Sequence, residues 1–119
     1  MYFIRLFCVT IIFLSLISCS KKIQDTPTIN QNNLELQTIE AYREGLKELE
    51  RGDVLYAAKK FNEAEILFPQ SEIAPQAALM AAYSYYSQNY YSDSIAELER
   101  FLKVYPNHEN LAYAEYLLG

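Results

Sequence analysis

The sequence contains few of the side chains that carry covalent or metal chemistry. Among its 119 residues there is no tryptophan, one histidine (His108) and two cysteines, Cys8 and Cys19, which both lie within the first twenty residues. The chain after Cys19 therefore forms no internal disulfide and holds no thiolate nucleophile. One histidine without cysteine partners cannot assemble a zinc site either. We expect His108, which lies in a predicted turn, to make local hydrogen bonds instead.

Motifs for phosphate binding and nucleophilic catalysis are absent as well. The sequence has no glycine-rich phosphate loop and no nucleophile elbow. Its carboxylates are scattered over predicted helix faces, and Glu44 and Glu48 are predicted to form a hydrophilic end-face rather than a catalytic pair. We therefore expect a protein that is not an enzyme and that uses no cofactor and no metal.

Basic side chains are in the minority. Acidic residues number 15 and basic residues 10, which gives a net charge of −5. Nucleic-acid binding depends on a surplus of lysine and arginine that neutralises phosphates, so no nucleic acid is expected as a partner. Apolar residues, by contrast, make up 51% of the chain, and tyrosine occurs 11 times. A packed core within one domain is therefore expected.

The first residues have the pattern of a secretory signal peptide. One cation, Arg5, precedes the almost entirely apolar run from Leu6 to Ile17. That run is too short to cross the hydrocarbon core of a bilayer, which needs about 20 helical residues. An apolar segment of this length after an early cation is typical of a signal peptide, which we assign to residues 1–18.

The end of this segment, Leu16-Ile17-Ser18-Cys19, resembles the bacterial lipobox. The resemblance implies that Cys19 is linked through a thioether to diacylglycerol and becomes the first residue after cleavage. The alternatives are an ordinary signal peptide with an incidental cysteine, and a cysteine buried in a core. Ser20 follows in place of the aspartate that commonly retains lipoproteins at the inner membrane, which implies sorting to the outer membrane.

A polar tether and a helical repeat follow the cysteine. Residues 19–33 are assigned to the lipidated cysteine and a flexible tether, since the stretch after Cys19 is polar and has no aromatic residue. From Leu34 onward apolar residues recur at intervals of three and four, which indicates helices. When the sequence of the helical part is shifted by 37 residues, residues of similar type align with one another. We divide it into repeats at 34–70 and 71–107 and a partial third at 108–119.

The repeat resembles the tetratricopeptide (TPR) unit, a helix-turn-helix hairpin. The first repeat has the expected small, aromatic and closing residues at the family spacing: Gly45, Gly52, Ala57, Phe61, Ala64 and Pro69. The second departs from the pattern, with Asn89, Ser94 and Phe101 in place of Gly52, Ala57 and Ala64. The sequence thus predicts an all-α, TPR-like α-solenoid of antiparallel helix hairpins with about two and a third repeats. The alternative is a generic helical bundle.

Small residues at fixed positions predict where the helices approach one another. Gly45 and Ala82 are expected to let the two helices of a hairpin cross closely, with Phe61 or Leu98 filling the space that remains. The predicted helices are 34–51, 53–68, 73–88, 92–104 and one beginning near residue 110. Asp53 is a candidate N-terminal cap for the helix that begins there, and Ser71 or a neighbouring residue is expected to cap the helix that begins at residue 73.

The first helix of each repeat carries an apolar and tyrosine-rich stripe. In TPR domains these helices line a groove, and a family-based register gives ten groove-facing positions. They are Ile39, Tyr42, Leu46, Leu49, Gln76, Leu79, Tyr83, Tyr86, Tyr113 and Tyr116. One interpretation is that these side chains pack in the core. The other is a ledge for a peptide, since tyrosine offers an apolar face and a hydrogen-bonding tip.

The second repeat also resembles the BamD/ComL family of outer-membrane assembly lipoproteins. The resemblance rests on Gln76, the run Tyr83–Tyr86, the pair Arg100–Phe101, the turn Pro106–Asn110, and on Tyr113, Tyr116 and Gly119. It covers residues 34–119, about half of a full family member, so an N-terminal fragment is expected.

This resemblance implies a lipid-anchored adaptor on the periplasmic face of the outer membrane, within the β-barrel assembly (BAM) complex. The implied partners are BamA and other BAM subunits, the β-signal peptides of unfolded outer-membrane proteins, and the outer membrane through Cys19. A β-signal alternates apolar residues and ends in an aromatic one, which suits a tyrosine-lined groove.

Two other function classes remain open at this point. One is another envelope TPR scaffold of the CpoB/YbgF type, although the short stretch between Cys19 and Leu34 leaves no room for the coiled coil of those proteins. The other is a lipoprotein enzyme with a TPR appendage, which would need a catalytic domain beyond Gly119.

Overall fold

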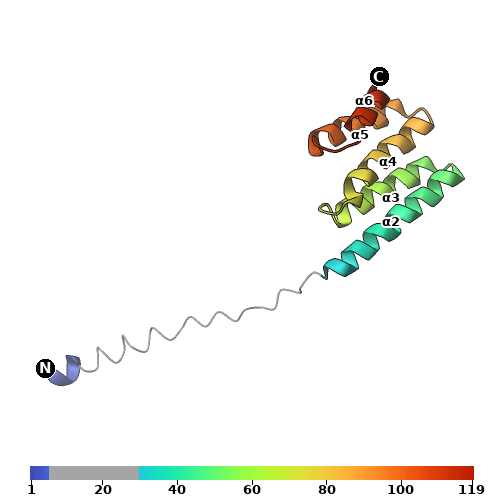
Figure 1. The fold of residues 1–119 in the computed structure, drawn as a ribbon. Coiled ribbons are helices and arrows are strands. Elements are labelled where there is room, and N and C mark those ends of the chain that lie inside the picture. Colours follow the sequence, from blue (N-terminus) through green and yellow to red (C-terminus); the bar gives the residue numbers. More distant parts are fainter. Residues whose placement is uncertain (6–29) are drawn as a thin grey trace.

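The computed structural model describes residues 1–5 and 30–119 (Figure 1). Most of the predicted signal peptide, Cys19 and the tether up to residue 29 lie outside the described residues. Residues 2–5 form a single helical turn, and the helices beyond residue 30 are α2 (Gln31–Arg51), α3 (Val54–Leu67), α4 (Ile73–Ser87), α5 (Tyr91–Val104) and α6 (Leu111–Leu118). The described part of the chain contains no strand, which confirms the predicted all-α class.

The helices stack as successive antiparallel hairpins. Each helix packs on the next one in the chain, and α2 also contacts α4, the first helix of the following hairpin. The α2/α3 hairpin is the first repeat, the α4/α5 hairpin is the second, and α6 begins a third (Figure 1). This arrangement confirms the predicted TPR-like solenoid.

The predicted boundaries of three helices, α3, α4 and α5, agree with the structure to within one residue. Helix α2, however, begins at Gln31, so residues 31–33, which we assigned to the tether, are helical. These residues are polar and exposed, so they add nothing to the apolar periodicity by which we placed the boundary. The side chain of Gln37 donates a hydrogen bond to Asn33 Oδ1 (3.0 Å) across this first part of the helix.

Both predicted capping residues accept hydrogen bonds at helix starts. Asp53 Oδ1 accepts from the backbone N–H of Tyr56 (3.1 Å) at the start of α3. Ser71 Oγ accepts from the backbone N–H of Ala74 (3.2 Å) at the start of α4. Pro75 is accommodated in that first turn, where its missing N–H has no intrahelical partner to lose. The caps therefore fix where the second helix of one repeat and the first helix of the next begin.

The core consists mainly of alanines around a few large side chains. One cluster lies between α2, α3 and α4 around Phe61, and the other joins α4, α5 and α6 around Leu98 and Phe101. All three large side chains are fully buried. At Gly45 an added Cβ would come within 2.8 Å of two ring carbons of Phe61. The predicted close approach at Gly45 is therefore confirmed.

The three departures of the second repeat each have a structural role. Asn89 adopts a left-handed backbone conformation (φ +66°), as Gly52 does in the first repeat (φ +86°). Asparagine is one of the few residues that tolerate this conformation. The buried Ser94 hydroxyl donates to the carbonyl of Ala82 (3.0 Å), which satisfies it inside the hairpin. Phe101 fills the second core cluster.

Replacing Gly52 with alanine should lower the free energy of unfolding by about 1 kcal/mol, because an L-residue in the left-handed region costs roughly 1–2 kcal/mol. Apart from Gly52 and the two residues next to it in the chain, no atom lies within 4 Å of the position that a Cβ would occupy here, so the substitution tests backbone conformation. Urea unfolding measures the loss. Asn89→Gly is the control and should be neutral or slightly stabilising. Equal stability of Gly52→Ala and the parent chain would contradict the left-handed backbone conformation assigned to residue 52.

No helix in the described part of the chain is both long enough and apolar enough to cross a bilayer.

Candidate functional site

The structure separates the ten predicted groove residues into buried and accessible side chains. Leu79 is only 6% exposed and belongs to the second core cluster, so its assignment to a groove is corrected to the core. Tyr42 and Leu49 are half-buried and pack against the first cluster. The ring of Tyr42 meets Phe61 edge-on at 5.3 Å, and burial raises the pKa of its phenol. These three side chains mainly support the fold.

The other seven positions retain access to solvent. Ile39 and Tyr83 are half-buried, and the exposed positions are Leu46, Gln76, Tyr86, Tyr113 and Tyr116. Tyr116 is the most accessible of the large apolar ones, with 76% of its surface exposed. The stripe is therefore neither all core nor all groove, and its accessible aromatic part lies on α4 and α6.

Tyrosines from α4 and α6 come together on one surface. Leu79 and Ala82 of α4 pack with Ala114 and Leu117 of α6 in the second core cluster, so Tyr83, which follows Ala82, and Tyr113, which precedes Ala114, lie at the edge of the same helix contact. Burial, and then the neighbouring phenols of Tyr83, Tyr116 and Tyr86, raise the pKa of Tyr113. The ring of Tyr86 also meets that of Tyr91, at the start of α5, edge-on at 5.9 Å. We call Tyr83, Tyr86, Tyr91, Tyr113 and Tyr116 the tyrosine face.

Sequence reasoning missed Tyr91 as a member of this surface. It belongs to the second helix of its repeat, whereas the TPR register assigns groove positions only to first helices. Its hydroxyl donates a hydrogen bond to Asn89 Oδ1 (2.6 Å), and Asn89 lies in the left-handed turn between α4 and α5. The turn therefore directs Tyr91 toward Tyr86. The tyrosine pair at residues 90 and 91, close after Tyr86, is the one sequence signal that could have indicated it.

The tyrosine face offers rings and hydroxyl groups rather than charges. Tyrosine provides a large rigid contact area at a low cost in conformational entropy, and its hydroxyl can donate and accept hydrogen bonds. Such a surface can hold apolar or aromatic side chains and hydrogen-bond a polypeptide backbone.

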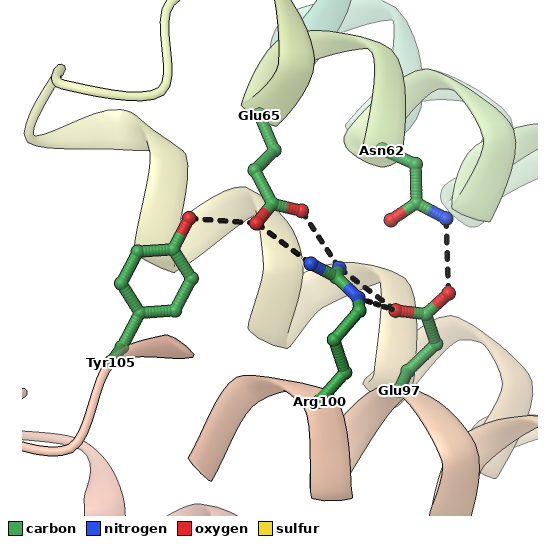
Figure 2. Close-up of polar contacts among 5 residues, drawn as sticks. All are labelled: Asn62, Glu65, Glu97, Arg100 and Tyr105. Atoms are coloured by element: carbon green, nitrogen blue, oxygen red, sulfur yellow. Dashed lines mark hydrogen bonds and ion pairs between the residues drawn. The ribbon is translucent and has the colours of Figure 1, made fainter. Parts of the chain in front are cut away.

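A polar cluster connects the two repeats on α3 and α5 (Figure 2). Arg100 donates from Nη1 to Glu65 Oε1 (2.8 Å) and from Nη2 to Glu65 Oε2 (2.7 Å), and the Tyr105 hydroxyl donates to Glu65 Oε1 (2.7 Å). Arg100 also donates from Nε and Nη2 to Glu97 Oε2 (3.0 and 2.9 Å). Asn62 Nδ2 donates to Glu97 Oε1 (3.2 Å). We call these five side chains the inter-repeat bridge.

Electrostatics in the bridge favour the ionised arginine and the protonated tyrosine. Its hydrogen bonds to Glu65, and then to Glu97, raise the pKa of Arg100 above its ordinary value. Burial, followed by the hydrogen bond to Glu65, raises the pKa of Tyr105. Sequence reasoning noted Arg100 only as part of a family resemblance and missed its partners. The repeat shift of 37 residues pairs Glu65 with Leu102, so the repeat gave no sign of the contact.

Glu44, Glu48 and His108 make local contacts. Glu44 pairs with Lys60 (3.0 Å), and Glu48 pairs with Arg51 (2.7 Å). His108 Nδ1 accepts from the backbone N–H of Asn110 (3.2 Å), which confirms the expected local hydrogen bond. Within residues 1–5 and 30–119, no group of three or more histidine, cysteine or acidic side chains is placed to hold a metal ion.

Comparisons with known proteins give consistent relatives. The family described as YfiO, outer membrane lipoprotein, matches residues 34–119. Relatives from several bacteria bear the name outer membrane protein assembly factor BamD. The one from Neisseria gonorrhoeae is 37% identical over 78 residues, which cover 66% of this chain and 29% of the relative. The one from Caulobacter vibrioides is 36% identical over 76 residues, covering 64% of this chain and 25% of the relative.

The third relative, from Rickettsia prowazekii, is 31% identical over 88 residues, covering 74% of this chain and 35% of the relative. The chain thus matches at most about a third of the length of these relatives. No solved structure matches the chain.

Proposed function

The chain belongs to the YfiO family of outer membrane lipoproteins, and from this premise we propose that it is a non-enzymatic adaptor in outer-membrane protein assembly. In this proposal the tyrosine face binds β-signal peptides of unfolded outer-membrane proteins. The names of the relatives, outer membrane protein assembly factor, support the assignment to this process. The peptide class is the one that the family resemblance implies, and the chemistry of the surface suits it.

The observation that carries the proposal is the gathering of accessible tyrosines from α4, α5 and α6. A β-signal alternates apolar side chains and ends in an aromatic one, so it brings ring-sized apolar groups and unpaired backbone amides. Tyrosine rings can pack against the former, and tyrosine hydroxyls can hydrogen-bond the latter.

The anchor and the protein partners belong to the same proposal. Lipidation of Cys19 would hold the repeats at the periplasmic face of the outer membrane, and BamA and other BAM subunits would be the partners in assembly. Several lipid chains at one cysteine would make attachment durable, because each buried CH₂ contributes about 0.8 kcal/mol.

Alanine substitutions on the tyrosine face should weaken peptide binding. We expect a fluorescent peptide with a β-signal sequence to bind the parent chain, and Tyr83→Ala with Tyr86→Ala to raise its Kd about ten-fold or more, as is typical for the loss of buried aromatic contacts. Tyr116→Ala should act in the same direction, and because this side chain is highly exposed its removal should leave the fold intact. Fluorescence anisotropy measures the three titrations.

Tyr56→Ala is the matched control, since it removes an accessible tyrosine from α3, outside the tyrosine face. It should leave the Kd within about two-fold, given that surface positions outside a contact contribute little. Circular dichroism checks that each variant retains its helices. An unchanged Kd for Tyr116→Ala and for the double variant would remove the tyrosine face from the mechanism.

A further inference from the structure

We propose that the inter-repeat bridge sets the angle between the two repeats and thereby shapes the tyrosine face, so that Arg100 and Glu65 are positioning residues for peptide binding. The expected effect on peptide affinity rests on the proposed function. The expected effect on the spacing of α3 and α5 rests only on the contacts between these two helices.

Polar contacts span the space between α3 and α5. A hollow of about 400 Å³ lies between these helices, bordered by Ile66 on α3 and Val104 on α5. Ile66 is 73% exposed and Val104 51% exposed, so these apolar side chains do not close the space. The two helices are instead connected across it by the hydrogen bonds of Arg100, Glu97 and Tyr105 (Figure 2).

The geometry of these hydrogen bonds restricts how α5 can move against α3. The two parallel hydrogen bonds from Arg100 to Glu65 fix orientation as well as distance, which is characteristic of paired guanidinium and carboxylate groups. A second attachment, from Asn62 to Glu97, lies about one turn away on each helix. A third, from Tyr105, lies beyond the end of α5. Because the contacts lie at several positions along α3 and α5, they resist both separation of the two helices and rotation of one helix against the other.

Loss of the arginine would leave a buried carboxylate poorly compensated. Glu65 is only 7% exposed, so water has little access to its carboxylate. Without Arg100 the carboxylate would remain as a largely buried charge with Tyr105 as its one remaining partner in the bridge. Uncompensated buried charge is strongly unfavourable. We therefore expect α3 and α5 to move apart until water reaches Glu65.

Helix α4 connects the bridge to the tyrosine face. Tyr85 borders a second hollow, together with Lys59 and Asn62 of α3. Successive residues in a helix are about 100° apart, so Tyr86 and Tyr83 point about 100° and 160° away from Tyr85. Tyr83 therefore lies on the side of α4 opposite the bridge, and Tyr86 lies on the flank between the two sides. A change in the α3–α5 spacing therefore tilts α5 and α6 about α4, and it displaces the tyrosines of α5 and α6 relative to Tyr83.

Two measurements on the full chain test the inference. Arg100→Met retains most of the aliphatic stem and removes the guanidinium, and Glu65→Gln removes the charge at constant shape. We expect each to raise the Kd for the β-signal peptide about three- to ten-fold with helix content unchanged. We also expect faster amide hydrogen exchange at the C-terminal ends of α3 and α5 without peptide. Lys103→Met and Glu99→Gln, at exposed positions of α5 outside the bridge, are the matched controls.

The outcomes separate the inference from the proposed function. If the parent chain fails to bind the peptide, the proposed function is wrong, while the exchange rates still test the bridge. If the parent chain binds and Arg100→Met matches Lys103→Met in both measurements, the positioning role is wrong. If Arg100→Met fails to fold, Arg100→Lys and Tyr105→Phe replace it, and each should give a smaller shift in the same direction; parent-like values for both would overturn the inference.

Discussion

Replacing Phe61 with alanine is expected to lower the free energy of unfolding by about 3–5 kcal/mol, the range for removing a fully buried phenylalanine. Phe61 has no exposed surface, and it is the largest side chain of the first core cluster. Its ring lies against Gly45 and meets Tyr42 edge-on at 5.3 Å. The other buried members of this cluster are alanines, which are too short to move into the cavity.

Urea unfolding followed by circular dichroism measures this loss. Ile66→Ala is the control, because it removes a large apolar side chain from the same helix at a site that is 73% exposed, and it should cost less than about 1 kcal/mol. Because a solenoid is held by contacts between neighbours, the first repeat should also show faster amide exchange than the second. A loss below about 1 kcal/mol for Phe61→Ala would contradict the packing described here.

Replacing Gly45 with alanine should also destabilise the fold, by about 1–2 kcal/mol. In an exposed helix interior this change stabilises by up to about 1 kcal/mol, because alanine favours the helix. Here the new methyl carbon would lie 2.8 Å from Phe61 Cδ1 and Cε1, and the ring is fully buried, so it can give way only by displacing its neighbours. Overpacking of this kind typically costs about 1–3 kcal/mol, so the steric cost exceeds the gain in helix propensity.

The sign of the Gly45 effect should reverse once the ring is removed. In the Phe61→Ala background the methyl group enters the cavity, so Gly45→Ala should become neutral or stabilising. Chemical unfolding of the parent, the two single variants and the double variant gives the coupling energy directly. Additive effects of the two substitutions would show that the close contact between Gly45 and Phe61 is not what makes glycine necessary.

Much of the fold could be predicted because local and repeated signals agree. The spacing from Gly45 to Phe61 and Pro69 specifies one hairpin, and the same spacing recurs after 37 residues. Asp53 and Ser71 mark helix starts through short side chains that bond the nearby backbone, which is a local rule visible in sequence. The start of α2 was misplaced because its first turn is polar and exposed, and apolar periodicity contains no information about such residues.

The site was harder to predict because exposure depends on which helices neighbour each position. Leu79 and Tyr83 are four residues apart on α4, yet Leu79 is buried against α5 and α6 while Tyr83 remains accessible. Their place in the helical period does not distinguish them. The Glu65–Arg100 pair joins residues 35 positions apart at unrelated places in the two repeats. No local pattern or repeat register indicates a contact of this kind.

Site-specific photocrosslinking tests the central claim most directly. A benzophenone amino acid is placed at Tyr116, on the tyrosine face, and in a second protein at Ile66, an exposed apolar position on α3. Each purified protein is irradiated with a labelled β-signal peptide. We expect an adduct at position 116 that unlabelled β-signal peptide competes away, and little or none at position 66. Equal adducts at both positions, or an adduct at position 66 alone, would contradict peptide binding by the tyrosine face.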